Sequence, residues 1–426
     1  MNLVLKVKKR SQREMAIAFA IFMPFTFGLL VDGLGFPTLV KYTIDIAWIL
    51  LLFLMACTRI TFPNKETKSL FRHTLCFFVV TLIGAVVAFQ SPLYYLWGFR
   101  NNFRFFVLFF ACILYLKREN IDEYLRVFDI LFYINFPVSL FQYYVQGYSQ
   151  DFLGGIFGVH KGCNGSVLIF FLIVIISSVL RYMNNRESFL KCMIKCSMAL
   201  LISVFAELKI MFVLLIIVIS VSALVTKFSF KKVVLFIFVV NAVLIGVSLL
   251  ESIFSNFEGW FSMEGILDII GSENGYTGKG DLNRMTCIPI VFNRFLTSGW
   301  KRLFGLGLGN CDTSAFEFLN TAFYKRYNFL NYNWFSTAFL LLETGITGLI
   351  CYVTFIVLVF VKAVRVRKAN KQREFECQMA QVFTVVLLVV FAYNSSLRTE
   401  AGYMAFFILA LPFIRDRKTV SMQKVN

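Results

Sequence analysis

Long, continuous apolar runs recur along the chain, separated by short polar segments. A helix needs ~20 mostly apolar residues to cross a bilayer. Twelve runs approach that length, at 15–31, 39–57, 73–90, 104–116, 125–145, 163–180, 193–206, 210–226, 233–250, 334–361, 377–394 and 401–414. Because the runs do not alternate apolar with polar residues, they favour helices. We predict an all-α, polytopic integral membrane protein with about twelve transmembrane helices.

The apolar stretch 193–226 is interrupted by Glu207 and Lys209, and basic clusters flank it on both sides. Lys and Arg prefer the cytoplasmic side of a membrane, so both flanks are expected there. The chain must then cross an even number of times between them. We therefore predict a helical hairpin with Glu207, Leu208 and Lys209 at its outer tip.

The basic residues are distributed unevenly between the two predicted sides. With both termini in the cytoplasm, 29 of the 42 Lys and Arg lie in cytoplasmic segments and 13 lie outside. The formal net charge of +18 then divides into +19 on the cytoplasmic side and −1 on the external side. The excess therefore follows the positive-inside rule and does not indicate nucleic-acid binding.

One predicted external connection, 251–333, is 83 residues long and joins spans nine and ten. It divides the chain into 1–250, with spans one to nine, the large loop, and 334–426, with spans ten to twelve and a cytoplasmic tail. Within the loop we expect a helix from about Leu282 to Thr297. A long structured loop is usually a lid or a binding element.

Composition and motifs exclude several classes of protein. The chain is 58% hydrophobic and 15% charged, whereas a soluble domain is about 25% charged. The glycine-rich 275–280 does not complete a phosphate loop, because position 273 is Glu and position 280 is Gly. Two histidines and no CxxC pair argue against a zinc site, and we expect no metal or other cofactor.

Ionisable residues near the predicted external face are the candidates for chemistry. The positive-inside bias disfavours Arg100 and Arg104 there, so they indicate either an anionic ligand or pairing with lipid headgroups. Lys209 and Glu207 can pair locally, or Lys209 can bind an anion. Other external candidates are Lys161, His160 and Arg398.

Three further candidates lie in or after the large loop. Arg284 and Arg294 are ten residues apart on the expected loop helix, and both could reach one large anionic group. Glu343 is nine residues into span ten, ~13 Å along a helix. A carboxylate at that depth is costly, so it serves either a function or a structural ion pair with a basic residue.

The side of the membrane limits the possible donors. Outside the cytoplasm there is no ATP or nucleotide sugar, so a transferase there must use energy stored in its substrate. A lipid-linked pyrophosphate is such a donor, with Arg and Lys suited to its phosphates. The interhelical grooves and outer aromatic residues would suit its lipid tail and its sugars.

Four segments carry a resemblance to a known family: FGVHKGCNG (157–165), SVFAELKIMF (203–212), LFGLGLGN (303–310) and WFSTAFLLLETGITGLI (334–350). Together with the span pattern, they resemble the superfamily of O-antigen and capsular-polysaccharide polymerases (Wzy-type) and O-antigen ligases. The spacing of Arg294 and Gly305, with ten residues between them, is similar to the Arg-x10-Gly element of the polymerases. The position of the ligase histidine is occupied by Trp334, which favours polymerase.

The resemblance implies an enzyme of the bacterial inner (cytoplasmic) membrane that joins undecaprenyl-pyrophosphate-linked oligosaccharide repeat units at the external face. Under it, Arg284, Arg294, Lys209, Arg100 and Arg104 would hold pyrophosphate. Glu343 would position a sugar or a cation, and Glu207, Asp281 and His160 are alternatives for the general base. A chain-length regulator is a further partner that the family implies. The alternatives are an O-antigen ligase, a lipid-linked oligosaccharide flippase or other transporter, and a purely structural membrane protein.

Overall fold

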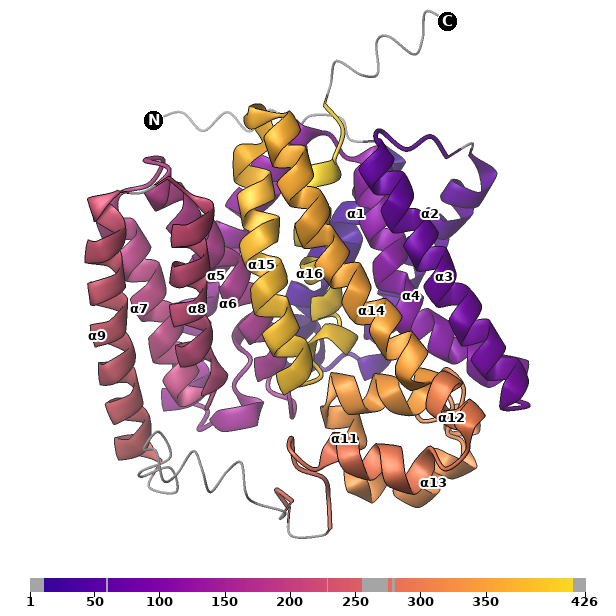
Figure 1. Cartoon of the computed structure of the whole chain (residues 1–426). Helices are drawn as coiled ribbons and strands as arrows, with labels where there is room; N and C mark the ends of the chain where they lie inside the picture. Colours follow the sequence, from indigo (N-terminus) through magenta and orange to yellow (C-terminus); the bar gives the residue numbers. More distant parts are fainter. Residues whose placement is uncertain (1–10, 59, 228, 255–274, 278–279, 417–426) are drawn as a thin grey trace, which may run out of the picture.

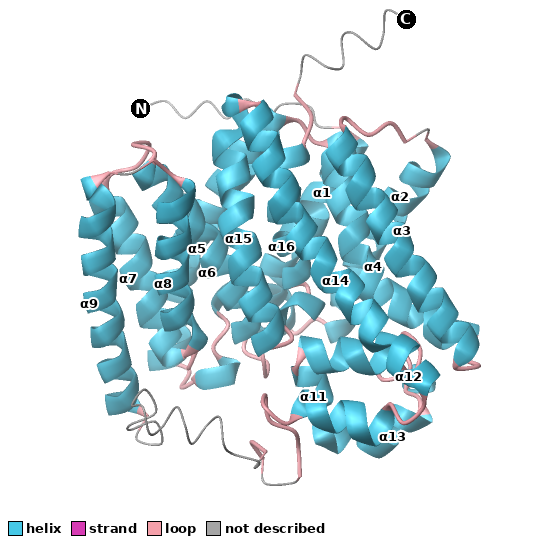
Figure 2. Ribbon diagram, viewed as in Figure 1, coloured by secondary structure: helices cyan, strands magenta, loops and turns pink. Residues whose placement is uncertain are grey.

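In the computed structural model, residues 11–58, 60–227, 229–254, 275–277 and 280–416 are described, and all regular elements in those ranges are helices (Figure 2). The α-helices are α1 (Gln12–Phe22), α2 (Thr43–Cys57), α3 (Lys65–Val87), α4 (Pro92–Tyr115), α5 (Arg118–Tyr144), α6 (Asn164–Met183), α7 (Phe189–Phe205), α8 (Ile210–Val225), α9 (Phe230–Ile253), α11 (Cys287–Ile290), α12 (Gly299–Phe304), α13 (Ala322–Tyr327), α14 (Ser336–Ala369), α15 (Glu374–Tyr393) and α16 (Ala401–Ala410). The prediction of an all-α fold is confirmed.

Each predicted span overlaps one or more helical segments, and seven helical stretches in the described ranges are long and apolar enough to cross a membrane. They are Thr38–Cys57, Lys65–Val87, Arg118–Tyr144, Asn164–Met183, Phe230–Ile253, Ser336–Ala369 and Lys371–Tyr393. Two shorter apolar helical stretches lie at Ile210–Val225 and Ala401–Phe413. These helices indicate a polytopic membrane protein, and the number twelve stays a prediction.

Two predicted spans differ from the helices that contain them. The first is not one α-helix, because α1 is followed by a short 3-10 helix at Met23–Thr26 and a short π-helix at Gly28–Gly33. Pro24 lacks the amide hydrogen that a continuous helix would use there. The fourth helix begins at Pro92, well before predicted residue 104, so Arg100 and Arg104 lie inside α4.

Helices α6 and α15 form the centre of the bundle, and α2, α3 and α9 lie at its margins (Figure 1). Most of the α6 side chains are buried, and α14 packs along both α3 and α15. The marginal helices instead expose apolar side chains, among them Phe53, Val86 and Ile245. A lipid environment explains such apolar exteriors, which are unfavourable in water.

The segments predicted to be cytoplasmic meet at one end of the bundle. The amide of Arg118 donates to the Arg415 carbonyl, and Arg373 pairs with Asp416 at 2.8 Å. At the other end of α14, the Ser336 amide and hydroxyl donate to the carbonyl of Asn394. The two predicted sides are thus separated in space, and which end faces the cytoplasm stays a prediction.

The described part of the predicted loop folds against the start of α14, where it forms a second small core (orange in Figure 1). The expected helix over 282–297 is wrong in extent: α11 begins at Cys287 and continues as a short π-helix over Val291–Phe295. Asn283 explains the later start, because its side-chain oxygen accepts the amides of Met285 and Thr286. Cys287 and Cys311 are both buried free thiols.

Candidate functional site

A cavity of about 470 Å³ opens at the bundle end that carries the large loop. Its walls come from α4, from the turn before α2, and from the segments around 312–315 and 395–400. The ionisable residues that line it are Lys41, Arg100, Arg104, Asp312, Arg398 and Glu400. Four cations therefore face two carboxylates in a confined space.

Arg100 is held in place by α2. Its guanidinium donates from Nε and Nη2 to the Asp45 carboxylate, with the shortest contact at 2.8 Å. The rings of Trp97 and Tyr42 each lie 5.1 Å from its guanidinium carbon. Because a bidentate partner already balances its charge, Arg100 shapes the cavity and orients its aromatic wall.

Asp312 connects three segments of the cavity wall. One of its carboxylate oxygens accepts from Arg398 at 2.9 Å and the other accepts from Asn101 at 2.8 Å. Arg398 also donates to the carbonyl of Asn333, and its guanidinium lies over the Phe339 ring. This network fixes the loop segment 310–313 against α4 and the turn before α16.

Arg104 differs from the other cations of the cavity. Its side chain is buried, with 3% exposed, and it makes no ion pair within the described residues. Its Nη2 donates to the Arg398 carbonyl at 3.1 Å, while Nε is buried without a hydrogen-bond partner. The Glu400 carboxylate interacts with this guanidinium electrostatically but makes no direct ion pair with it. The unpartnered Nε therefore remains available to an anion in the cavity.

Glu400 is the second carboxylate of the cavity, next to the start of α16. Burial opposes its ionisation, but Arg104 and Lys41 outweigh that effect and keep the pKa of the Glu400 carboxyl below its ordinary value. It makes no ion pair within the described ranges. Glu400 therefore stays ionised at neutral pH. It can accept a proton, or a hydrogen bond from a sugar hydroxyl.

His160 and Lys161 approach the same region from the connection before α6. The Nε2 atom of His160 lies 3.3 Å from the Lys41 ammonium, and Lys161 lies 4.9 Å from the centre of the Trp334 ring. Burial and the neighbouring Lys41 lower the pKa of His160, so its ring is neutral at pH 7. A neutral imidazole can accept a proton there.

A second cationic group lies at the predicted hairpin tip. A short turn separates α7 from α8. In it, Glu207 adopts a positive φ of 54° and pairs with Lys209 at 3.1 Å. The local pair considered from the sequence is therefore present. Burial and the nearby Arg284 lower the pKa of Lys209 to about 8 despite that pair. Lys209 and Arg284 are thus within electrostatic range of each other.

Arg284 is oriented by two tyrosines. Its Nη1 donates to the Tyr276 hydroxyl at 2.9 Å and its Nε donates to the Tyr393 carbonyl at 3.0 Å. The Tyr393 ring lies 4.0 Å from its guanidinium carbon. Tyr393 ends α15 and begins the segment 393–400, which continues to Arg398 and Glu400 in the cavity. One short segment therefore connects the two cationic groups.

The connection 150–163 approaches both groups, because His160 lies beside Lys41 and Asp151 acts electrostatically on Lys209. Helix α5 holds this connection in place. Gln142 makes two hydrogen bonds with the backbone of Gly155, at 2.7 and 2.8 Å, and Asn135 accepts from the amide of Ile156. Because these polar side chains are buried, the bonds fix the backbone that carries His160.

Glu343 has a different role from the ion pair considered from the sequence. Its side chain is fully buried, and one carboxylate oxygen accepts from the Cys311 amide at 3.0 Å. The neighbouring backbone carbonyls of Leu342 and Glu343 accept from the amides of Leu306 and Gly307. Within the described ranges Glu343 makes no ion pair, and its other carboxylate oxygen has no partner. It anchors the glycine-rich segment behind the cavity.

Arg294 does not join either cationic group. It is exposed on the π-helix Val291–Phe295, beside the rings of Phe295 and Tyr327, and shares no described contact with Arg284. The expectation that both arginines lie on one helix is wrong, because Arg284 precedes that helix. Asp281 is occupied as well, since its carboxylate accepts the amides of Tyr276 and Thr277.

The sequence did not single out Lys41, Asp45, Asp312 or Glu400 as site residues. The available signal was proximity in the chain: Glu400 follows Arg398 by two residues, and Asp312 follows the glycine-rich 304–310. Such spacing becomes informative only after the cations themselves have been recognised.

Comparison with protein-family models finds no match, and comparison with curated proteins finds none either. Assignment of function therefore depends on the chemistry of the side chains. The arrangement can bind an anion with two or more charges, beside an ionised carboxylate and a neutral imidazole.

Proposed function

We propose that the protein is a surface-polysaccharide polymerase that joins polyprenyl-pyrophosphate-linked oligosaccharide units at the external face of the membrane. The observation that carries the proposal is Arg104, a buried guanidinium without an ion-pair partner in the described structure, in a cavity with three other cations. A pyrophosphate supplies the negative charge that this cavity lacks. The resemblance to O-antigen and capsule polymerases points to the same donor.

The proposed reaction transfers a growing glycan to the sugar of an incoming unit. A hydroxyl oxygen of the acceptor attacks the anomeric carbon of the donor, and the bond from that carbon to the pyrophosphate oxygen breaks. The pyrophosphate leaves with the bonding electrons, and Arg104 stabilises the charge that develops on it. Glu400 or His160 accepts the acceptor's proton.

The second cationic group, Lys209 with Arg284, extends the anion-binding surface of the proposed site. We assign it to the pyrophosphate of the second lipid-linked substrate, because polymerisation needs two such lipids at once. Trp97 and Tyr42 provide aromatic surface for sugars next to the cavity.

Deletion of the gene in its bacterial host, followed by gel analysis of surface and lipid-linked glycan, tests the proposal. A polymerase predicts surface glycan capped at one repeat unit, restored to full length by the wild-type gene. Full-length polymer retained on the lipid carrier would instead indicate a ligase, and repeat units trapped on the cytoplasmic side would indicate a flippase. An unchanged glycan profile would contradict all three.

A further inference from the structure

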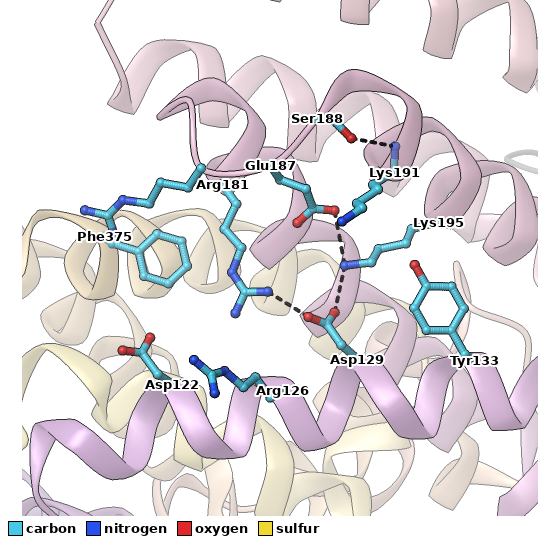
Figure 3. A pocket seen from close by; sticks show the side chains of 11 residues that line it. Asp122, Arg126, Asp129, Tyr133, Arg181, Glu187, Ser188, Lys191, Lys195 and Phe375 are labelled. Atoms are coloured by element: carbon cyan, nitrogen blue, oxygen red, sulfur yellow. Dashed lines mark hydrogen bonds and ion pairs between the residues drawn. The ribbon is translucent and has the colours of Figure 1, made fainter. Parts of the chain in front are cut away.

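A second polar cavity, of about 680 Å³, lies at the opposite end of the bundle. Its walls are α5, the end of α6, the start of α7 and the first turn of α15 (Figure 3). Five cations and three carboxylates line it, which leaves an excess of two positive charges. The proposed polymerase chemistry uses none of these residues.

Four of the charged residues neutralise one another and build the inner wall. Asp129 accepts from Arg181 at 2.7 Å and from Lys195 at 2.8 Å, and Lys195 also pairs with Glu187 at 3.2 Å (Figure 3). The hydroxyl of Ser178 donates to Glu187 at 2.6 Å. These bonds connect three helices and fix the floor of the cavity.

The charge excess lies on the exposed rim. Arg126, Arg186 and Lys191 line the cavity, are exposed, and make no ion pair within the described ranges. Asp122 is the remaining carboxylate of the rim. Arg126 comes from α5 and Lys191 from the first turn of α7, so the cations approach the opening from different elements (Figure 3).

Two further groups shape the opening. The buried ring of Phe375 faces the guanidinium carbons of Arg186, at 5.7 Å, and Arg181, at 6.0 Å. Ser188 caps α7 by accepting from the Lys191 amide at 3.4 Å, and both residues line the cavity, so the positive N-terminal end of that helix lies at its edge. Several cations and a helix N-terminus around one cavity suit phosphoryl oxygens.

We propose that this cavity is a binding site for a phosphoryl anion carrying at least one full negative charge, at the end of the bundle predicted to be cytoplasmic. Two sources share this chemistry: the headgroup of an anionic phospholipid in the adjacent leaflet, and a soluble phosphorylated compound. The rim cations supply the affinity, and the neutral inner quartet holds them in position.

A charge-matched pair of variants tests the proposal. The first, Arg126→Gln/Arg186→Gln/Lys191→Gln, removes the rim cations and keeps the inner quartet. The control, Lys227→Gln/Lys368→Gln/Lys371→Gln, removes three exposed cations from the same end outside the cavity. Both are purified in neutral detergent and compared with wild type for monodispersity and thermal unfolding.

Two probes distinguish the sources. Native mass spectrometry counts phosphatidylglycerol retained from mixed micelles with phosphatidylcholine. Calorimetry measures pyrophosphate binding to the delipidated protein, with Arg104→Gln present in every protein compared in order to remove the binding expected at the external cavity. Loss of retained phosphatidylglycerol in the rim variant alone identifies a lipid site, and pyrophosphate affinity weakened more than about 10-fold in that variant alone identifies a soluble ligand. Equal behaviour of the rim variant and the control with both probes would overturn the proposal.

Discussion

Gly305 and Gly345 lie against each other where the glycine-rich segment 303–310 meets α14, which is kinked at Gly345 by a non-helical backbone conformation. A Cβ atom on Gly345 would lie 2.6 Å from the Gly305 amide nitrogen and 2.4 Å from the Leu303 carbonyl carbon. A Cβ on Gly305 would lie 2.4 Å from the carbonyl carbon of Glu343. Both glycines have positive φ, 77° and 66°. Two distant motifs of the sequence therefore form one interlocked joint behind the cavity.

The variant Gly345→Ala is expected to unfold this joint. The strained backbone costs about 1–3 kcal/mol with a side chain, and the clash with backbone atoms of Leu303 adds to it. Thermal unfolding in detergent should show a lower midpoint than wild type, and polymer formation should be lost.

Gly299→Ala is the matched control for the joint. Gly299 has no atom within 4 Å of its Cβ position and no positive φ. Its substitution should leave the unfolding midpoint unchanged. If Gly345→Ala unfolds at the same temperature as Gly299→Ala, the two glycines do not determine the stability of the joint.

The joint illustrates what the sequence can predict here. Continuous apolar runs identify the helices, because a helix in lipid must present apolar side chains over its whole length. Glycine-rich motifs indicate tight turns, but the sequence pattern does not show that the segment 303–310 packs against Gly345. Similarly, Pro24 ends α1 earlier than the apolar pattern indicates, since the pattern does not register a missing hydrogen-bond donor.

Arg100, Arg104 and Arg398 could be recognised because they run against the positive-inside bias, whereas Lys41 was not singled out. Their partners could not, since Arg100 meets Asp45 across 55 residues and Arg398 meets Asp312 across 86. Only the tertiary structure distinguishes the paired Arg100 from Arg104, whose burial and lack of an ion pair mark it out. In the sequence, Arg100 and Arg104 are each preceded by a phenylalanine in the same aromatic-rich stretch, so local sequence does not separate them.

Arg104→Gln is expected to weaken binding of pyrophosphate and to shorten or abolish polymer. Charged hydrogen bonds of this kind contribute roughly 1.5–3 kcal/mol each, so the affinity should fall about 10- to 100-fold. Calorimetry with pyrophosphate, and gel analysis of glycan in complemented cells, measure the two effects.

Lys325→Gln provides the comparison for Arg104→Gln. Lys325 is an external cation outside the cavity, and it pairs with the exposed Glu317. The Lys325→Gln variant should bind pyrophosphate with the affinity of the wild type. Equal losses in the two variants would show that the effect is a general one of external charge and would contradict the role of Arg104.

The affinity for anions should depend on pH through Lys209. Its pKa of about 8 means that it is mostly protonated at pH 7 and mostly neutral at pH 9. Its contribution to anion binding is therefore present below pH 8 and is lost as the pH rises through that value. A bound anion favours the protonated form and moves the loss to higher pH.

Lys209→Arg isolates this effect, because a guanidinium stays charged over the whole interval. We expect pyrophosphate affinity of the wild type to fall between pH 7 and 9 relative to that of Lys209→Arg. Because pyrophosphate itself titrates in this range, the two affinities are compared as a ratio at each pH, which cancels that effect. A ratio that stays constant with pH would exclude Lys209 as an anion-binding group.

Glu343 distinguishes anchoring from direct chemistry. If it holds the Cys311 amide, an uncharged acceptor of the same shape suffices, so Glu343→Gln should fold and form polymer as wild type does. Glu343→Ala leaves that buried amide without its acceptor, at a cost of about 1–3 kcal/mol. We expect a lower unfolding midpoint and loss of polymer in the alanine variant.

The pair of Glu343 variants separates the two roles because the glutamine change removes the ionisable carboxyl group and keeps the acceptor for the Cys311 amide. A folded Glu343→Gln protein without polymerising activity would assign the carboxylate to the reaction. A glutamine variant as unstable as the alanine variant would show that the carboxyl group stabilises the joint by more than its hydrogen bond to the Cys311 amide. Full activity in Glu343→Gln identifies Glu343 as a positioning residue for the segment that carries Asp312.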